Sequence, residues 1–386
     1  MKFMLIHPSE DISLYFCEIE KTMKYIKLIF LSLFLVGCGD ADRGKAFITS
    51  QEGGITVIDL NSMEVTDQID VGAGYPRGIG VTDDGKYLIT ANKADANLSK
   101  INYETKEVEN IDVGINPEFV RVYNNQVFVS TEPSSKGKPP AKGEMKHDDD
   151  DDDDDEDRTP AKVAVVDLNE NKKIREITAG PETEGIEFSQ DGSKIIVTNE
   201  ADNTVTIHDF NSGEIVKTID ASPYGLRPRG IKVSPNGQFY IATLEHSDNF
   251  IVMDKDFNHV KTVKTEHEVD EGDKHTGKSP YGVSFNQSGD KLFVAASGGY
   301  KKRSTLEVYD GKSFEKIDRI RTEGRRCWHF TFTPDNKDIS LACGRSDEVL
   351  VIDAESLDIK KRVPVAGIPW GIVTYPKSIG SLDQAN

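Results

Sequence analysis

One unit of roughly 42 residues recurs along most of this 386-residue chain, and this internal repeat constrains the fold more than any other feature. Each copy opens with a short entry motif, Pro-x-Gly in its clearest form, which is followed by an alternating apolar segment and a turn. The seven entries are Pro76-Arg77-Gly78, Pro117-Glu118-Phe119, Thr183-Glu184-Gly185, Pro228-Arg229-Gly230, Pro280-Tyr281-Gly282, Cys327-Trp328-His329 and Pro369-Trp370-Gly371.

A second landmark gives the same count of seven. The third apolar segment of each unit ends in an Asp or Asn, and these residues are Asp59, Asn102, Asp167, Asp209, Asp254, Asp310 and Asp353. A side-chain oxygen at this point can accept hydrogen bonds from backbone amides in the turn that follows. We therefore expect this series to have a structural role.

The pattern within one unit predicts four short strands. Ile231-Lys232-Val233 alternates as a strand should, and Pro235-Asn236-Gly237 has the composition of a hairpin turn. Ile195–Thr198 and Val163–Asp167 are typical second and third strands. Four strands repeated seven times predict an all-β fold, a seven-bladed β-propeller of four-stranded antiparallel blades. Two smaller all-β domains are the alternative, which the even repeat disfavours.

The N-terminal part has the features of an export signal. Met23-Lys24-Tyr25-Ile26-Lys27 is basic, and the apolar run from Leu28 to Val36 is too short to span a bilayer as a helix. The run ends in Leu35-Val36-Gly37-Cys38, which resembles the lipobox of bacterial lipoproteins. The resemblance implies a signal peptide over residues 23–37, cleavage before Cys38 and diacylation of its thiol.

The resulting layout has five parts. Residues 1–22 are acidic where a signal peptide should be basic, so we interpret them as an upstream extension that is not part of the native precursor. Residues 38–43 would be a lipid-anchored tether, 44–376 the propeller and 377–386 a C-terminal tail. This layout places the protein in the cell envelope on the periplasmic face. Gly39 after the lipidated cysteine favours the outer over the inner membrane by analogy with lipoproteins.

The acidic balance of the chain excludes one class of partner. The formal net charge is −19 and no basic patch compensates, whereas nucleic-acid binders cluster Lys and Arg. Residues 134–161 form an insertion in blade three, with an unbroken acidic run over Asp148–Asp157. Adjacent carboxylates repel one another, so we expect a disordered loop. It is a solvated linker, a weak divalent-cation binder or a segment that contacts a basic partner through its charge.

Two stretches resemble a known family. Ile196-Val197-Thr198-Asn199, followed by Asp202-Asn203-Thr204-Val205, is similar to the repeat of the YVTN β-propellers, and Tyr87–Asn92 is a looser copy. The resemblance covers about residues 44–376. It implies an exported propeller, similar in fold to the haem domain of periplasmic nitrite reductases and to quinoprotein subunits. We expect this propeller to be monomeric. The repeat is a framework motif and identifies no activity.

In such propellers the innermost strand follows the entry motif. The entry loops and the loops between second and third strands should then share one face around the central channel. The candidate ligand or partner residues on this face are Arg77, Asn92, Asn199, Glu200, Arg229, His246, Tyr281, Trp328, His329, Arg345 and Trp370.

Two observations bear on cofactors, and neither identifies one. His329 stands where five of the other six entries have glycine, and it is a metal or haem ligand, a proton carrier or a core histidine. Glu118 and Glu184 are candidate metal ligands of a lactonase-type site, although further acidic ligands are not evident. The chain has no catalytic signature such as G-x-S-x-G, H-E-x-x-H or C-x-x-C-H.

We expect Cys327 and Cys343 to form a disulfide inside blade six, counted by the sixth entry motif, because the turn Thr333–Lys337 should join the first two strands of that blade. If Thr333 opposes Lys337, Cys327 opposes Cys343, at a separation that a disulfide accepts. Buried free thiols and a small Cys–His metal site that includes His329 are the alternatives.

These patterns leave two function classes. The first is a non-catalytic lipoprotein that binds an envelope protein or a ligand at the channel face. The second is a redox or electron-transfer accessory, or an enzyme that uses haem, quinone or a divalent metal at the same face.

Overall fold

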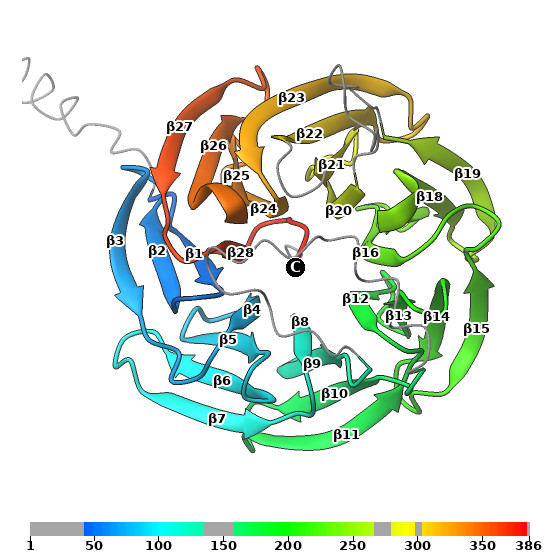
Figure 1. Ribbon diagram of the computed structural model, residues 1–386, viewed down its shortest axis with the longest axis horizontal. Coiled ribbons are helices and arrows are strands. Elements are labelled where there is room, and N and C mark those ends of the chain that lie inside the picture. Colours follow the sequence, from blue (N-terminus) through cyan, green and yellow to red (C-terminus); the bar gives the residue numbers. More distant parts are fainter. Residues whose placement is uncertain (1–41, 135–157, 266–278, 298–302, 384–386) are drawn as a thin grey trace, which may run out of the picture. The chain divides into compact units, whose positions relative to one another are not determined.

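The computed structural model describes residues 42–134, 158–265, 279–297 and 303–383, which form seven four-stranded sheets around a common axis (Figure 1). The predicted all-β, seven-bladed propeller is therefore confirmed. Cys38, the signal segment and the acidic run Asp148–Asp157 lie outside the described residues. Within the described part, no helix is long and apolar enough to cross a membrane.

In every blade, four strands follow one another from the central axis to the rim. Blade one is β28 (Pro369–Tyr375), β1 (Lys45–Ser50), β2 (Ile55–Asp59) and β3 (Glu64–Ile69); blade two is β4 (Pro76–Val81), β5 (Tyr87–Asn92), β6 (Asn97–Asn102) and β7 (Val108–Asp112); blade three is β8 (Pro117–Tyr123), β9 (Gln126–Thr131), β10 (Lys162–Asp167) and β11 (Lys172–Thr178); blade four is β12 (Thr183–Phe188), β13 (Lys194–Asn199), β14 (Thr204–Asp209) and β15 (Ile215–Asp220). Blade five is β16 (Pro228–Val233), β17 (Phe239–Leu244), β18 (Asn249–Asp254) and β19 (His259–Lys264); blade six is β20 (Ser279–Phe285), β21 (Lys291–Ser297), β22 (Arg303–Asp310) and β23 (Lys316–Arg325); blade seven is β24 (Cys327–Phe332), β25 (Asp338–Cys343), β26 (Glu348–Asp353) and β27 (Ile359–Pro364).

Blade one closes the ring with strands from both ends of the propeller. The C-terminal strand β28 pairs antiparallel with β1, with Lys45 opposite Tyr375 and Ala46 opposite Thr374. This arrangement joins the two ends of the ring by backbone hydrogen bonds, so that neither leaves an inner strand unpaired.

The Asp and Asn residues that end the third strands have the predicted structural role. Asp59 Oδ1 accepts hydrogen bonds from the backbone amides of Asn61 and Ser62, at 3.0 and 2.9 Å. Asp353 Oδ1 accepts from Glu355 and Ser356 in the same way. Equivalent pairs of bonds are made by Asn102, Asp167, Asp209, Asp254 and Asp310.

Burial falls from the axis to the rim. The innermost strands are almost wholly buried, because they face both the neighbouring blades and the central channel. Along the outermost strands, exposed residues alternate with less exposed ones. The exposed side chains include aliphatic ones such as Ile215 and Ile317, which are 51% and 53% exposed.

The C-terminal segment lies against the innermost strand of blade seven. The amide of Phe332 donates to the carbonyl of Ile379 (3.0 Å), and the amide of Ser381 donates to the carbonyl of Phe330 (2.9 Å). Ile379 and Leu382 are 8% and 1% exposed. Residues up to Asp383 therefore belong to the packed propeller, which extends past the expected boundary at residue 376.

Candidate functional site

The second residue of every entry motif contributes one side chain to a ring at one end of the channel, which we call the mouth. The ring consists of Arg77, Glu118, Glu184, Arg229, Tyr281, Trp328 and Trp370, from β4, β8, β12, β16, β20, β24 and β28. Its members in blades two to five are charged, and those in blades six, seven and one are aromatic. The mouth therefore has a charged half and an aromatic half.

Glu118 is the buried centre of the first ion-pair group. Its Oε1 lies 2.5 Å from a guanidinium nitrogen of Arg77 and 2.5 Å from Nζ of Lys93. Lys93 also contacts Oε2 of Glu132 at 2.9 Å. Lys93 and Glu132 come directly after the second strands of blades two and three, so neighbouring blades are joined through these pairs.

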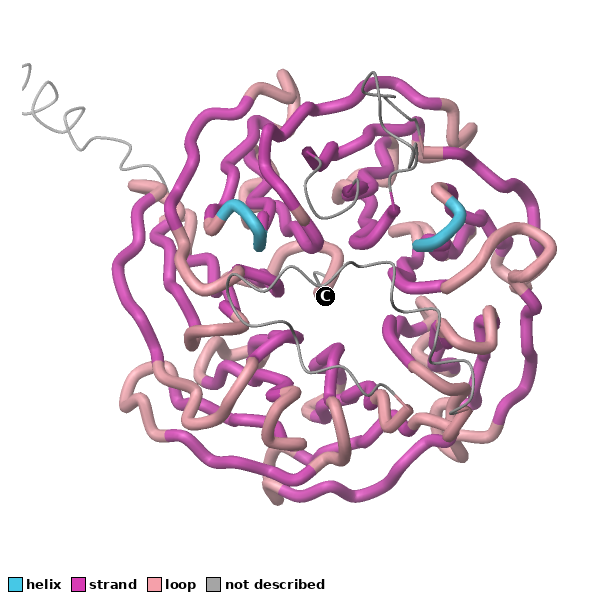
Figure 2. The backbone as a smooth tube through the Cα atoms, in the orientation of Figure 1, coloured by secondary structure: helices cyan, strands magenta, loops and turns pink. Residues whose placement is uncertain are grey.

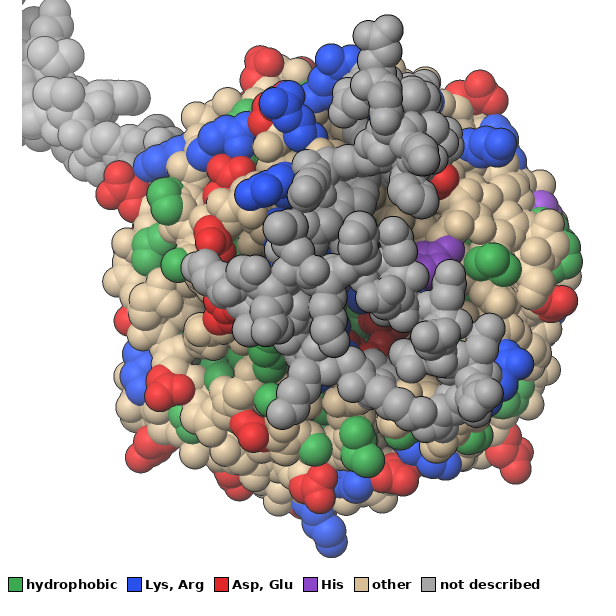
Figure 3. Space-filling model, viewed as in Figure 1, with side chains coloured by type: hydrophobic (Ala, Val, Ile, Leu, Met, Phe, Trp, Pro, Cys, Tyr) green, Lys and Arg blue, Asp and Glu red, His purple; other side chains and the backbone are tan. Residues whose placement is uncertain are grey.

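Arg229 is the centre of the second group. It contacts Glu184 and Glu200, both at 3.1 Å, and Glu245 at 2.7 Å. Arg227, two residues earlier, pairs with Glu200 at 2.5 Å and with Glu182 at 3.0 Å. In the space-filling view, acidic side chains are visible near the axis between the grey segments (Figure 3).

The two groups meet where three carboxylates converge. Glu118, Glu132 and Glu184 each offer an oxygen, and these oxygens lie within 4.8 Å of one another. Burial, together with the charge of Glu132, raises the pKa of Glu184 well above its ordinary value. Burial would also raise the pKa of Glu132, but Lys93 and a hydrogen bond with Glu184 hold it below its ordinary value.

Glu200 is a further carboxyl that is expected to hold a proton near neutral pH. Burial raises its pKa to about 8, even though Arg227 and Arg229 oppose that rise. Carboxyl groups with shifted pKa values that lie close together around a channel are a common property of functional sites.

The aromatic half of the mouth is faced by arginines. Arg77 lies over the rings of Trp370 and Tyr75, at 5.8 and 5.7 Å from their centroids. Arg326 lies over Tyr281 and Trp328 at 5.6 and 5.5 Å. It also donates a hydrogen bond to the Tyr281 hydroxyl at 2.7 Å. These contacts continue the polar network around the ring.

The backbone directly before the innermost strands is strained. A non-glycine residue with positive φ occupies this position in six of the seven blades, and these residues are Tyr75, Asn116, Glu182, Arg227, Arg326 and Ile368. Such conformations cost free energy for residues with a β-carbon and concentrate at functional sites. Here they place Tyr75, Glu182, Arg227 and Arg326 beside the ring residues.

His329 and Phe119 lie one residue further along the innermost strands and meet each other. Their rings pack edge to face at 5.4 Å, and His329 lies 4.3 Å from the Trp370 ring. Nδ1 of His329 is hydrogen-bonded to Ser381 Oγ at 3.1 Å. Burial lowers the pKa of His329 well below its ordinary value, so the imidazole is neutral.

A third charged group lies below the aromatic layer that Phe119, His329 and Trp370 form. The guanidinium of Arg121 contacts Glu187 at 3.3 Å, and Nζ of Lys232 lies 3.5 Å from the same carboxylate. Lys232 also donates to the carbonyl of Asp383 at 2.7 Å. The C-terminal segment therefore fills the end of the channel opposite the mouth.

The structure brings together seven of the predicted face residues. Arg77, Glu200, Arg229, Tyr281, Trp328, His329 and Trp370 lie in or directly below the mouth. His246 and Arg345 lie in the short 3-10 helices η2 (Glu245–Ser247) and η3 (Gly344–Ser346), which Figure 2 marks, next to the ring rather than in it.

Asn92 and Asn199 are not presented at the mouth, which corrects the sequence prediction. Both are fully buried inside their own blades. Asn92 Nδ2 donates to Asn97 and Ser99, and Asn199 Nδ2 donates to Thr204 and Thr206. They end the second strands and hold the turn to the third strand. The residues that follow them, Lys93 and Glu200, are the ones that reach the network.

Sequence reasoning missed several members of the site. Lys93, Glu132, Arg227, Glu245 and Phe119 were not singled out. The signal that could have found them was position within the repeat: Lys93, Glu132, Glu200 and Glu245 each directly follow a second strand, and Phe119 replaces an entry glycine as His329 does.

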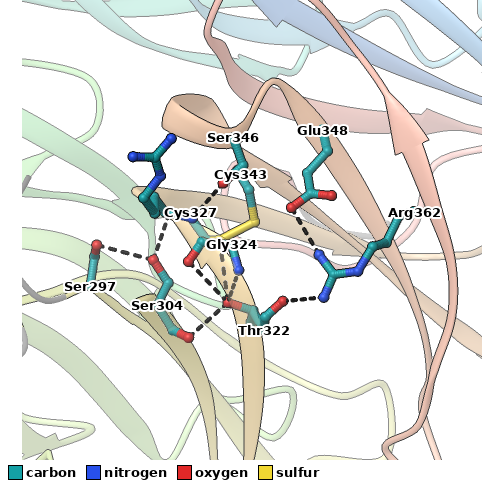
Figure 4. The surroundings of a disulfide bond; sticks show 10 residues. Ser297, Ser304, Thr322, Gly324, Cys327, Cys343, Ser346, Glu348 and Arg362 are labelled. Carbon is teal, nitrogen blue, oxygen red and sulfur yellow. Dashed lines mark hydrogen bonds and ion pairs between the residues drawn. A yellow bond between two sulfur atoms is a disulfide. The ribbon is translucent and has the colours of Figure 1, made fainter. Parts of the chain in front are cut away.

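Cys327 and Cys343 face one another in blade seven, as predicted, and their sulfur atoms are bonded (Figure 4). The predicted turn register is wrong by one residue, since Phe332 lies opposite Ile339 and the Thr333 amide donates to the Asp338 carbonyl. An irregularity between Cys327 and Phe330 shifts the register back, so that the two cysteines still pair. Gly324 of β23 packs over the bond, since a β-carbon there would lie 2.9 Å from the Cys343 sulfur. Thr322 Oγ1 accepts a hydrogen bond from the Gly324 amide and donates to the Ser304 carbonyl. The bond therefore lies at a tightly packed junction of blades six and seven.

Comparison with known proteins supports the same architecture. The family model of the cytochrome d1 haem domain matches residues 158–298. The chain is a seven-bladed β-propeller similar to that domain. No curated protein matches the sequence.

Similar solved structures cover most of the chain. The periplasmic gluconolactonase of Pseudomonas aeruginosa has 14% identity and a TM-score of 0.65, and covers 86% of this chain and 98% of its own. Hydrazine synthase of Kuenenia stuttgartiensis has 18% identity and a TM-score of 0.61, with 79% and 94% covered. Dihydro-haem d1 dehydrogenase NirN has 16% identity and a TM-score of 0.60, with 87% and 76% covered. At these identities the likeness concerns the fold alone.

The residues around His329 do not fit a haem. Its imidazole is 2% exposed, and Phe119, Trp370 and Ser381 surround it. Among the described residues it joins no other metal-ligating side chain, since the group that could hold an ion is Glu118, Glu132 and Glu184. We therefore derive no chemistry through haem.

Proposed function

We propose that this protein is a lipid-anchored, non-catalytic β-propeller of the cell envelope that binds a protein partner or ligand at the mouth. The observation that carries the proposal is the mouth, where the ring of entry-motif residues is charged in four blades and aromatic in three. The ring is largely buried and would form the base of the surface, and the exposed loops that lead into the innermost strands would form its rim. Aromatic and arginine side chains are enriched where proteins recognise partners.

Two features of the mouth support recognition from one side. The opposite end of the channel is filled by the C-terminal segment, so a partner approaches from the mouth. Ile115 and Leu226, which are 60% and 45% exposed, lie in the loops directly before β8 and β16. Exposed aliphatic side chains around a polar centre suit contact with another protein.

The envelope location is supported by sequence. The order of basic, apolar and lipobox segments over residues 23–38 is typical of a lipoprotein precursor, and the disulfide partners Cys327 and Cys343 suit an oxidising compartment. Lipid on Cys38 would hold the propeller at a membrane, with the outer membrane favoured.

Capture from detergent-solubilised envelope tests the binding surface. Full-length protein is compared with the double variant Ile115→Asp, Leu226→Asp at the mouth. The matched control is Ile215→Asp, Ile317→Asp on the outermost strands, where the side chains are similarly exposed. We expect the mouth variant to lose partners that the wild type and the control retain. Equal capture by all three proteins would contradict the proposal.

The second function class is a cofactor-dependent enzyme or electron-transfer accessory. The match of residues 158–298 to the cytochrome d1 haem domain favours it. An absorbance spectrum of protein purified from its native envelope separates the two classes. A stoichiometric haem or quinone band would favour the second, and a spectrum with protein absorbance alone favours the binding role.

A further inference from the structure

We propose that Glu118, Glu132 and Glu184 form a binding site for one hard divalent cation at the base of the mouth. Glu118 and Glu184 were predicted from the sequence as candidate metal ligands, and the structure brings them together with Glu132, the residue directly after β9. The three carboxylates come from blades three and four, and their nearest oxygens lie within 4.8 Å of one another. This site goes beyond the proposed binding role and does not depend on it.

Two oxygens of this group have unused bonding capacity. Oε2 of Glu118 and Oε2 of Glu184 are buried, and no amine, guanidinium, amide or hydroxyl group among the described residues donates to them. Without an ion, the neighbouring carboxyls can interact only by sharing a proton, as in the hydrogen bond between Glu184 and Glu132. The two residues are 0% and 2% exposed. A buried carboxylate oxygen without a partner is costly, and coordination to a cation is one of the few ways to satisfy it.

The charge of the surrounding network also leaves room for a cation. The linked ion pairs among the described residues contain six carboxylates, from Glu118, Glu132, Glu182, Glu184, Glu200 and Glu245. They contain four cations, from Arg77, Lys93, Arg227 and Arg229. When all six carboxylates are ionised, six negative charges against four positive ones leave an excess of two negative charges. One divalent ion would neutralise this excess in place of the protons that Glu184 and Glu200 otherwise hold.

Lys93 does not occupy the unused oxygens. Its ammonium contacts Oε1 of Glu118 and Oε2 of Glu132, whereas the unpartnered oxygen of Glu118 is Oε2. Arg229 likewise contacts Oε1 of Glu184 and leaves Oε2 without a partner. The lysine and arginine therefore orient the carboxylates, and the cation would use their other oxygens.

The donor set restricts the ion. Carboxylate oxygens without nitrogen or sulfur ligands suit Mg²⁺, Mn²⁺ and Ca²⁺ rather than softer metals. Three protein ligands leave positions that water, or an oxygen-bearing group of a ligand in the mouth, can fill.

Mn²⁺ binding measured by electron paramagnetic resonance tests the site. The acidic run Asp148–Asp157 is a second potential cation binder, so its residues are first replaced by Asn and Gln in the full-length chain. In that background we expect one saturable Mn²⁺ site per chain, which Ca²⁺ displaces. Glu184→Gln keeps the shape of the side chain and should weaken Mn²⁺ binding by about tenfold or more, since it removes a charged ligand.

The matched control is Glu182→Gln. It removes the same unit of charge from the same network but lies outside the three converging carboxylates. It should weaken Mn²⁺ binding by less than about threefold, because charges outside the coordination shell act only through space. Circular dichroism checks that each variant folds, and Glu132→Gln replaces Glu184→Gln if the latter does not.

Two results would overturn the proposal. Equal weakening by Glu184→Gln and Glu182→Gln would show diffuse attraction without coordination. No saturable site after replacement of the acidic run would show that the carboxylates hold protons instead and that cations bind the run. The Mn²⁺ count needs no envelope partner, so its failure is distinguishable from a failure of partner capture.

Discussion

Lys232 is a fully buried lysine below the mouth, and its environment predicts how the stability of the protein depends on pH. Burial, followed by the charge of Arg121, lowers its pKa to about 7. Glu187 at 3.5 Å and the carbonyl of Asp383 at 2.7 Å hold the amine. The folded protein therefore releases this proton at a lower pH than the unfolded chain does.

Stability should consequently rise with pH through this residue. Between about pH 7 and pH 10 the unfolded chain binds one more proton at Lys232 than the folded protein, so the free energy of unfolding increases with pH by an amount on the order of a few kcal/mol. Lys232→Met removes this contribution. Urea unfolding of both proteins across the range checks the prediction, and parallel pH dependences would reject it.

The pair Cys327 and Cys343 gives a second prediction at this scale. The two cysteines are 16 residues apart, and closing a loop of this size stabilises a protein by about 2–4 kcal/mol. The double variant Cys327→Ala, Cys343→Ala should lose about that much free energy of unfolding. Mass spectrometry of the unreduced exported protein should find the linked peptides. Two freely alkylated thiols would show that the bond does not form in the cell.

At the scale of elements, the C-terminal segment acts as an additional short strand on the inside of blade seven. It bonds to the backbone of β24, including a bridge between Thr331 and Gly380, and Ser381 contacts His329. An innermost strand otherwise has a free edge toward the axis. The segment covers that edge and fills the channel below the aromatic layer.

Removal of residues 378–386 should destabilise the whole propeller. Ile379 and Leu382 would no longer be buried, and each aliphatic side chain contributes about 1.5–3 kcal/mol on burial, so we expect a loss of about 3 kcal/mol or more. Both tryptophans of the chain, Trp328 and Trp370, lie in the mouth, so their fluorescence reports the change. Removal of residues 384–386 alone is the control, and equal stability of the two truncations would contradict the role of the segment.

For the whole molecule, the proposed attachment point Cys38 lies outside the described residues of the propeller. We predict that Cys38→Ser releases the protein from the membrane or leaves unprocessed precursor, because lipid on this thiol is the proposed attachment. Fractionation of cells that express wild type and variant measures it. Unchanged membrane retention together with unchanged processing would reject lipidation of Cys38.

The fold could be predicted from sequence because each blade repeats the same local signals. Entry motifs, turns and strand-ending Asp residues act within one unit, so the role of Asp59 and the pairing of Cys327 with Cys343 could be predicted from nearby residues. The irregularity between Cys327 and Phe330, which shifts the register of this hairpin by one residue, could not. The repeat count then fixes the number of blades, since each blade buries its faces against its neighbours.

The site was only partly predictable because its contacts join different blades. Arg77 pairs with Glu118, and Arg229 with Glu200, across blade boundaries that sequence spacing does not reveal. The direction of a side chain at the end of a strand also changes with each residue. That is why Asn199 was assigned to the mouth with Glu200, although only Glu200 reaches the network.

Photo-crosslinking in intact cells tests the central claim, that the mouth is the binding surface, most directly. A photoreactive residue is placed at Ile115 beside the mouth or, as the control, at Ile215 on the outermost strand β15 of blade four; both side chains are exposed. The account predicts a discrete crosslinked product from position 115 and none from position 215. A product from position 215 alone, or the same product from both, would contradict it.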